Sequence, residues 1–215
     1  MSCDASKLRV LPAGDRALLL TPGDRENLDG LVDLLRGAEL TGMQDLLPAA
    51  QTVLLTLAAG ADAETVEREL RQLLATTPTT RSGSEDAGDP LTIRVRYDGA
   101  DLDDVARLLD ISVEELVARH TGRVWRCRFI GFTAGFGYLA SPGWGLSVPR
   151  RQQSRTSVPP GSVGLADGYS AVYPRRAPGG WQLIGSTDEP MWDLDRPRPA
   201  LLSPGTLVRF VAVGR

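Results

Sequence analysis

The chain has 215 residues, of which 42% are hydrophobic and 24% are charged, and its formal net charge is −3. A chain of this length and composition forms one large globular domain or two small ones. It contains no apolar run near the ~18 residues of a membrane span, and the N-terminal MSCDASKLRV lacks the apolar stretch of a secretory signal. We therefore expect a cytoplasmic protein with no membrane contact.

Residues 1–76 predict a small α/β sandwich domain. Residues 8–20 (LRVLPAGDRALLL) are typical of two short strands around a tight turn, and residues 52–58 (TVLLTLA) of an apolar strand. A helix is expected over residues 26–36, which place their apolar side chains on one face. A second helix is expected to begin after Asp62, because aspartate is a favoured N-cap residue.

Residues 77–90 predict a linker, because this stretch is polar, rich in Pro and Gly, and without periodicity. Residues 91–215 then predict a domain that is mostly β. It opens with the alternating strand LTIRVRY and two short helices, the second with a capping box at Ser112 and Glu115. After Val124 the pattern favours a closed or nearly closed β-barrel. Its expected strands are VWRCRF, GLSVP, SVGLA, YSAVYP, WQLIGS and TLVRFVAV.

The two helices resemble a helix-turn-helix motif, but they carry negative charge, which does not suit DNA binding. Phosphate would be repelled by the acidic side chains that they carry. These are Asp101, Asp103, Asp104, Asp110, Glu114 and Glu115. We therefore expect no nucleic-acid partner.

Residues 116–166, which we call the cationic segment, contain no Asp or Glu. Their basic residues are Arg119, Arg123, Arg126, Arg128, Arg150, Arg151 and Arg155. Guanidinium groups gathered in this way favour binding of a carboxylate, a phosphate or an acidic partner surface. The alternative is that single arginines only solvate strand faces.

Residues 129–139 (FIGFTAGFGYL) lie inside the cationic segment and follow a G-x-x-x-G-x-G pattern. This spacing matches neither the dinucleotide-binding nor the P-loop motif, so the stretch is either a ligand cradle or a tight bend between strands. His120 ends the helix before it, where the helix dipole favours a protonated imidazole. Its alternative role is capping or packing. With one histidine and two cysteines, Cys3 and Cys127, we expect no metal site and no disulfide framework, and Cys127 is expected to be a strand residue.

Four motifs together carry a family resemblance: FIGFTAGFGYL, PRRQQSRTSVPPGSVGLA, YPRRAPGGWQLIGST and SPGTLVRF. With them the chain resembles the KipI / allophanate hydrolase subunit 1 family, whose bacterial members include the B subunit of ATP-dependent 5-oxoprolinase. The resemblance implies α+β architecture, an N-terminal α/β domain followed by a cyclophilin-like β-barrel. It also implies a hydrolase complex that converts 5-oxo-L-proline to L-glutamate, in which this chain contributes half of a shared active site.

The implied partners are the carboxyltransferase-like C subunit of 5-oxoprolinase and its third, LamB/YcsF-type A subunit. ATP is expected as a co-substrate of the complex, with no cofactor bound tightly to this chain, which is expected to be inactive without its partners. Two alternatives stay open. One is the carboxyltransferase half of a urea carboxylase/allophanate hydrolase system, and the other is a non-enzymatic inhibitor of a sensor histidine kinase.

The resemblance also implies the site residues. The catalytic residues would be His120, Arg150 and Arg155. The substrate- or anion-binding residues would be Phe132, Gly135, Phe136, Tyr138, Gly161, Ser162, Tyr173, Gly179, Gly180, Trp181 and Thr187. The chain departs from the family pattern at Ala134, where the family usually has proline.

Overall fold

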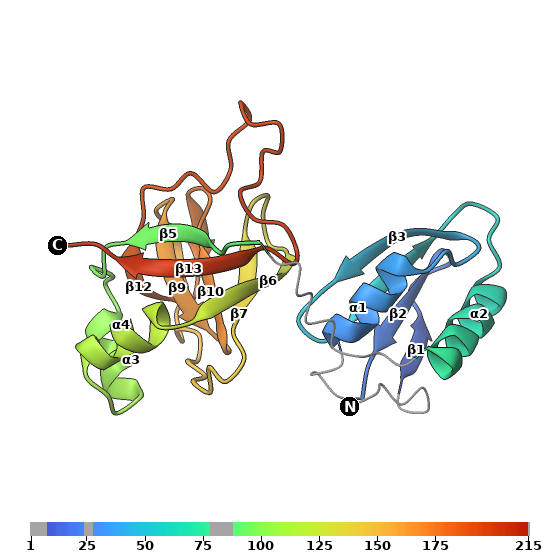
Figure 1. Ribbon diagram of the computed structural model, residues 1–215, viewed down its shortest axis with the longest axis horizontal. Coiled ribbons are helices and arrows are strands. Elements are labelled where there is room, and N and C mark those ends of the chain that lie inside the picture. Colours follow the sequence, from blue (N-terminus) through green and yellow to red (C-terminus); the bar gives the residue numbers. More distant parts are fainter. Residues whose placement is uncertain (1–7, 24–27, 78–87, 215) are drawn as a thin grey trace. The chain divides into compact units, whose positions relative to one another are not determined.

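The computed structural model describes residues 8–23, 28–77 and 88–214. The chain divides into two compact units, Met1–Glu85 and Asp86–Arg215 (Figure 1). Most of the predicted linker, residues 77–90, lies outside the described residues. No helix in the described ranges is both long and apolar enough to cross a membrane.

The first unit is a four-stranded antiparallel sheet with two helices against it (Figure 1). Its strands are β1 (Arg9–Pro12), β2 (Ala17–Thr21), β3 (Met43–Pro48) and β4 (Val53–Leu57), in the order β1-β2-β4-β3. Its helices are α1 (Leu28–Gly37) and α2 (Ala63–Thr76). Alternate residues of β2 and β4 are buried, and they pack with the apolar faces of both helices in one core. Asp62 caps α2 as predicted, because its carboxylate accepts a hydrogen bond from the Thr65 backbone N–H at 3.1 Å.

The second unit is a seven-stranded sheet that nearly closes on itself. Its strands are β5 (Leu91–Val95), β6 (Val124–Ile130), β7 (Gly137–Ala140), β9 (Ser162–Ala166), β10 (Tyr169–Val172), β12 (Gln182–Ser186) and β13 (Leu207–Ala212). The order is β12-β9-β10-β7-β6-β13-β5, and only β13 and β5 run parallel. The two outer strands meet where Arg96 and Ser186 exchange backbone hydrogen bonds of 2.8 Å each. The predicted succession of an α/β sandwich and a nearly closed barrel is therefore confirmed.

Two helices and a short ribbon complete the second unit. The helix α3 (Leu102–Leu108) lies against β12, and α4 (Val113–Thr121) lies against β13 (Figure 1). Ser112 caps α4 by accepting a hydrogen bond from the Glu115 N–H at 3.1 Å, as predicted. The ribbon pairs β8 (Arg155–Val158) with β11 (Ala177–Gly179).

The local patterns predicted one strand that does not form and missed four that do. Residues 145–149 (GLSVP) form no strand, because Gly145 takes a φ of +65° and Pro149 has no N–H for a ladder. The missed strands are β3, β7, β8 and β11. They are short or carry Pro and Gly at their ends, so their local sequences resemble loops.

Candidate functional site

The glycine-rich stretch 129–139 forms the connection between β6 and β7 and contains two successive tight turns. The Thr133 N–H donates to the Gly131 carbonyl at 2.7 Å, which closes a γ-turn around Phe132. The Phe136 N–H donates to the Thr133 carbonyl at 3.0 Å, which closes a β-turn whose third residue, Gly135, has a φ of +80°. The tight-bend interpretation of this stretch is thus confirmed.

These turns hold Phe132 in an unusual state. Its φ is +64°, a value that a bulky side chain rarely adopts and that costs on the order of 1–3 kcal/mol. Its ring is also 59% exposed, while Phe136 four residues later is only 1% exposed. The two rings touch edge to face, with their centroids 5.5 Å apart. The hairpin therefore stores strain and presents an aromatic ring to solvent at the same point.

Behind Phe136 lies a group of aromatic rings that we call the outer aromatic cluster. Its members are Phe136, Tyr138, Tyr169, Tyr173 and Trp181. Phe136 contacts Tyr138, Tyr173 and Trp181 edge to face at 5.1 to 5.4 Å, the arrangement that aromatic pairs prefer. Successive strand residues point to opposite faces of a sheet. Tyr169 and Ala171 of β10 join this cluster, while Val172 joins the core inside the barrel, so the cluster lies on the outer face of the barrel.

Two of the predicted arginines lie near this cluster. Burial raises the pKa of Tyr138 and of Tyr173, and the positive charge of Arg150 opposes that rise at both hydroxyls. Arg155 has the same effect at Tyr173. Arg150 is more than half exposed and pairs with Asp167 at 3.2 Å. Phenol and guanidinium groups are donors that suit an oxyanion, so binding of an anion near Arg150 and Tyr138 stays a prediction.

A buried carboxylate, which the sequence patterns do not single out, holds Arg155 in place. Asp101 is only 2% exposed, and its Oδ1 accepts from Arg155 at 2.7 Å and from Arg151 at 2.5 Å. Its Oδ2 accepts from the Leu183 backbone N–H at 2.7 Å. Burial alone would raise the pKa of Asp101, but the hydrogen bond from Arg155 and the other two contacts outweigh it and lower the pKa. Arg155 and Arg151 are therefore largely engaged by Asp101, whereas Arg150 is open to solvent.

Several predicted glycines stand where the backbone approaches another group too closely for a side chain. A Cβ added at Gly179 would lie 2.2 Å from the Tyr173 hydroxyl, and one at Gly161 would lie 2.2 Å from the Thr187 carbonyl oxygen. At Gly180 the added atom would lie 2.9 Å from Ser154 Oγ. This close packing by itself requires glycine at these positions. A contact of the Gly179 or Gly180 N–H with a ligand remains a prediction, whereas the Gly161 N–H already bonds the Tyr173 carbonyl.

Ser162 and Thr187 lie with Gly161 where β9 meets the end of β12. The Gly161 N–H donates to the Tyr173 carbonyl at 2.7 Å, and the Thr187 N–H donates to the Gly161 carbonyl at 2.9 Å. Ser162 accepts from the Tyr173 N–H at 2.9 Å through its own carbonyl. These backbone contacts fix the position of Tyr173 in the outer aromatic cluster.

His120 lies inside the barrel, away from the arginines of the outer face. Its ring is fully buried and stacks on Phe210 with centroids 4.4 Å apart. Its Nδ1 lies 2.7 Å from the Tyr97 hydroxyl and its Nε2 lies 2.9 Å from Ser170 Oγ. Because Ser170 points from β10 to the inner face, the sheet separates His120 from the outer aromatic cluster.

The expectation of a protonated imidazole at the end of α4 is wrong. Burial, with a smaller contribution from the charge of Arg123, lowers the pKa of His120 to about 3. The ring is therefore neutral at physiological pH, because the apolar interior outweighs the helix dipole. The hydrogen bonds of its ring to Tyr97 and Ser170 agree with the alternative interpretation, in which His120 is a packing residue.

Cys127 is buried in β6, where burial raises the pKa of its thiol to about 12. The prediction that it is a strand residue is confirmed. Within the described ranges, no three His, Cys, Asp or Glu side chains are placed to hold a metal ion.

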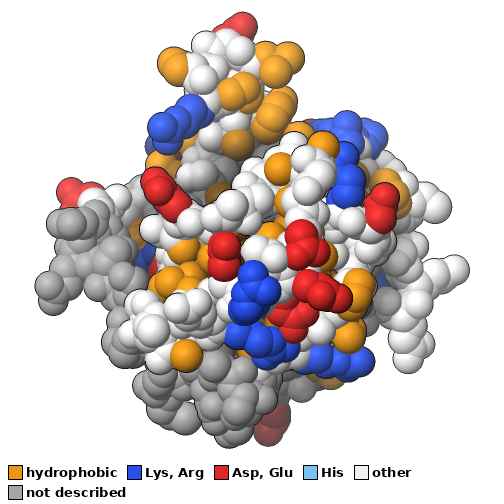
Figure 2. Space-filling model, turned by 90° about the vertical axis from the view of Figure 1, so that its right-hand side faces the viewer, with side chains coloured by type: hydrophobic (Ala, Val, Ile, Leu, Met, Phe, Trp, Pro, Cys, Tyr) orange, Lys and Arg blue, Asp and Glu red, His pale blue; other side chains and the backbone are white. Residues whose placement is uncertain are grey.

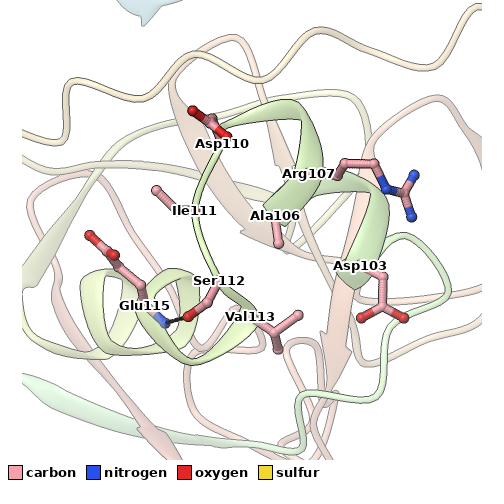
Figure 3. A pocket seen from close by; sticks show the side chains of 8 residues that line it. All are labelled: Asp103, Ala106, Arg107, Asp110, Ile111, Ser112, Val113 and Glu115. Atoms are coloured by element: carbon pink, nitrogen blue, oxygen red, sulfur yellow. Dashed lines mark hydrogen bonds between the residues drawn. The ribbon is translucent and has the colours of Figure 1, made fainter.

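The helix pair that resembles a DNA-binding motif borders a shallow, open hollow of about 510 Å³ (Figure 3). Three carboxylates line it, from Asp103, Asp110 and Glu115, and Arg107 is the one base among its lining residues. Arg107 is also engaged by Asp104 at 2.8 Å. Phosphate would be repelled from this face.

Comparison with known proteins places the chain in a family. The family model for the carboxyltransferase domain, subdomain C and D, matches residues 8–202. The chain is similar to the 5-oxoprolinase B subunit of Haemophilus influenzae, at 40% identity over 116 residues, which is 54% of each chain. It is also similar to the 5-oxoprolinase B subunit of Escherichia coli O157:H7, at 44% identity over 56% of this chain and 57% of that one. The matched part thus spans about half the length of these curated relatives.

Solved structures share the fold. The protein TTHA0988 superposes with a TM-score of 0.70 at 33% identity, covering 93% of this chain and 41% of that chain. A conserved uncharacterized protein of Pyrococcus horikoshii covers 95% of this chain and 97% of its own, with a TM-score of 0.56 at 28% identity. Kluyveromyces lactis urea carboxylase has a TM-score of 0.69 at 16% identity, covering 98% of this chain and 22% of that one, which shows a common fold alone. The family model covers most of the chain, and the chain therefore belongs to the carboxyltransferase-domain family, subdomains C and D.

Proposed function

We propose that this chain is a subunit of an ATP-dependent 5-oxoprolinase complex that hydrolyses 5-oxo-L-proline to L-glutamate. The observation that carries the proposal is the 38 to 44% identity to three relatives named as B subunits of 5-oxoprolinase. Because these matches span about half of each relative, the activity and the partners are inferred for this chain.

In this proposal the chain supplies an anion-accepting half-site, and a carboxyltransferase-like subunit supplies the other half. Opening the lactam breaks its C–N bond, adds water across that bond, and is driven by hydrolysis of ATP to ADP and phosphate. Negative charge develops on the lactam oxygen during the reaction and is also present on the substrate carboxylate. In this proposal Arg150, which is exposed and acts on the pKa of Tyr138, stabilises such charge together with the Tyr138 hydroxyl.

Arg155 and Asp101 act as positioning residues in this scheme. Asp101 ties Arg155 to the backbone of Leu183, which follows Trp181 of the outer aromatic cluster by two residues. The chain contains neither glycine motif for binding nucleotide phosphates. We therefore assign the ATP site to another subunit, and we expect the isolated chain to be inactive.

The alternative of a urea carboxylase component has weaker support. The likeness to urea amidolyase and urea carboxylase of Kluyveromyces lactis is at 18% and 16% identity, a level that reports on fold. The 5-oxoprolinase subunits share more than twice that identity over their matched segments.

The test is reconstitution of the chain with its two proposed partners, the carboxyltransferase-like and the LamB/YcsF-type subunits. Glutamate is measured after addition of 5-oxoproline and ATP, and ADP release is measured separately with urea, bicarbonate and ATP as the alternative substrates. Arg150→Ala should lower kcat/KM by about 10-fold or more with an unchanged melting temperature, since Arg150 makes only an exposed ion pair. Arg107→Ala is the matched control, an exposed arginine in a similar pair. No glutamate from the wild-type assembly would reject the proposal.

A further inference from the structure

Phe132 combines a strained backbone conformation with an exposed ring. The γ-turn holds its φ at +64°, and its ring is 59% exposed. Burial of the ring does not offset the cost of this conformation. Strain of this kind persists where another function depends on the geometry.

A second apolar element lies against the same hairpin. A Cβ added at Gly135, three residues after Phe132, would lie 3.2 Å from the Cβ of Trp192 and 3.1 Å from the carbonyl oxygen of Met191. Trp192 is 39% exposed and Leu194 is 77% exposed. Both belong to the loop between β12 and β13, which forms the projection at the top of Figure 2, where hydrophobic side chains gather. We call Phe132, Trp192 and Leu194 the projecting apolar patch.

The projection is ordered by its own hydrogen bonds. The Asp193 N–H donates to the Pro199 carbonyl at 2.9 Å, and the Leu201 N–H donates to the Met191 carbonyl at 3.0 Å. Arg196 donates to the Pro190 carbonyl at 2.8 Å. A surface held in place in this way loses little conformational entropy when it binds.

The projecting apolar patch is continuous with the candidate site. Phe132 contacts Phe136, and Phe136 contacts both Tyr138 and Tyr173 of the outer aromatic cluster. A protein seated on the patch would therefore lie beside the face that Arg150 borders. Leu108 is also an exposed apolar residue, but it lies on α3 and not on the hairpin or the projection.

We infer that the projecting apolar patch is the docking surface for the carboxyltransferase-like partner. The inference rests on the proposed function. The choice of occupant is supported by the family model, which describes subdomains C and D of a carboxyltransferase domain, and by TTHA0988, at 33% identity, where the matched region is 41% of a longer chain. Exposed Phe and Trp side chains on a rigid support are enriched in protein interfaces, and the Asp193–Arg196 ion pair beside them provides the polar rim that such interfaces have.

The test measures, by titration calorimetry, the dissociation constant between the full chain and the purified carboxyltransferase-like subunit. Phe132→Ala and Trp192→Ala should each weaken binding about 30-fold or more, the range of interface hot spots. Leu108→Ala is the matched control, because Leu108 is 55% exposed and lies on α3, and it should leave binding unchanged. Phe132→Gly adds a second measurement. Glycine accepts a positive φ, so this variant should melt no lower than wild type and still lose binding.

Each outcome decides the inference. If the wild-type complex forms and releases glutamate while Phe132→Ala and Trp192→Ala bind as wild type does, the docking surface is wrong and the proposed function stands. If Phe132→Ala binds normally but lowers kcat alone, Phe132 contacts substrate and the docking role is wrong. If the chain alone is a dimer that Phe132→Ala dissociates, a second copy is the occupant and the inferred partner is wrong. If wild type neither binds the partner nor supports glutamate release, the proposed function fails, and the inference fails with it.

Discussion

The buried histidine makes the stability of the second unit depend on pH in a definite direction. His120 has a pKa near 6.5 in the unfolded chain and about 3 in the folded protein. Between pH 6.5 and pH 3, His120 is therefore protonated in the unfolded chain but neutral in the folded protein. Its contribution to stability is complete above pH 6.5 and is lost progressively as the pH falls towards 3, by about 1.4 kcal/mol per pH unit. At pH 5 the loss is about 2 kcal/mol.

Because the chain has a single histidine, this loss can be assigned to one group. The assay is urea denaturation followed by tryptophan fluorescence at pH 7, 6 and 5, since Trp125 lies 5.0 Å from the histidine ring. His120→Gln can keep hydrogen bonds to Tyr97 and Ser170 but cannot titrate, so its free energy of unfolding should vary much less over this range. A wild-type free energy of unfolding that is the same at pH 7 and pH 5 would refute the reasoning.

Three further predictions concern the stability of the second unit. Asp101→Asn should lower the free energy of unfolding, measured by urea denaturation, by about 3 kcal/mol, because the buried group that accepts from two arginines loses its charge. The control is Asp104→Asn, which removes the charge from an exposed pair and should change the free energy of unfolding by less than about 0.5 kcal/mol. Equal effects of the two substitutions would contradict the role of Asp101 as the buried partner of both arginines. Ala134→Pro should raise the melting temperature by a few degrees, because residue 134 is the second residue of a β-turn, where proline is favoured and stabilises by about 0.4–1 kcal/mol. A melting temperature below that of wild type would mean that the turn is incompatible with proline. Gly179→Ala should lower the free energy of unfolding by about 1–3 kcal/mol, because the added methyl group clashes with the Tyr173 hydroxyl. The control is Gly37→Ala, where an added Cβ meets open space within the described part of the chain. Equal losses at the two sites would mean that the hydroxyl moves aside.

Much of the fold could be predicted from local sequence. The cap at Asp62 was identified because aspartate is a favoured N-cap residue, and the cap at Ser112 because a capping box pairs residues three positions apart. The core strands β4 and β5 were identified because their side chains follow a simple burial pattern. The strands β8 and β11 were missed, since each is defined by its pairing with the other and not by its own residues.

The electrostatics of the site could not be predicted in the same way. The cationic segment contains no acid, but acids outside its limits pair with it: two adjoin its ends, and the third, Asp101, lies 15 residues before it. Glu115 binds Arg119, Asp167 binds Arg150, and Asp101 binds Arg151 and Arg155. A count along the sequence cannot include contacts made in space, so it overstated the free positive charge.

His120 illustrates the same limit. Its place at the end of a helix is visible in the sequence and predicts a raised pKa. Its burial against Phe210 and Trp125 depends on the closure of the barrel, which brings β13 and β6 to the helix. Desolvation then exceeds the effect of the helix dipole and reverses the direction of the shift.

The most direct test of the central claim is the product balance of the reconstituted complex. With 5-oxoproline and ATP, the complete assembly should release glutamate and ADP in equal amounts, and omission of this chain should abolish both. Release of glutamate at the same rate without this chain, or no release with all subunits present, would contradict the account.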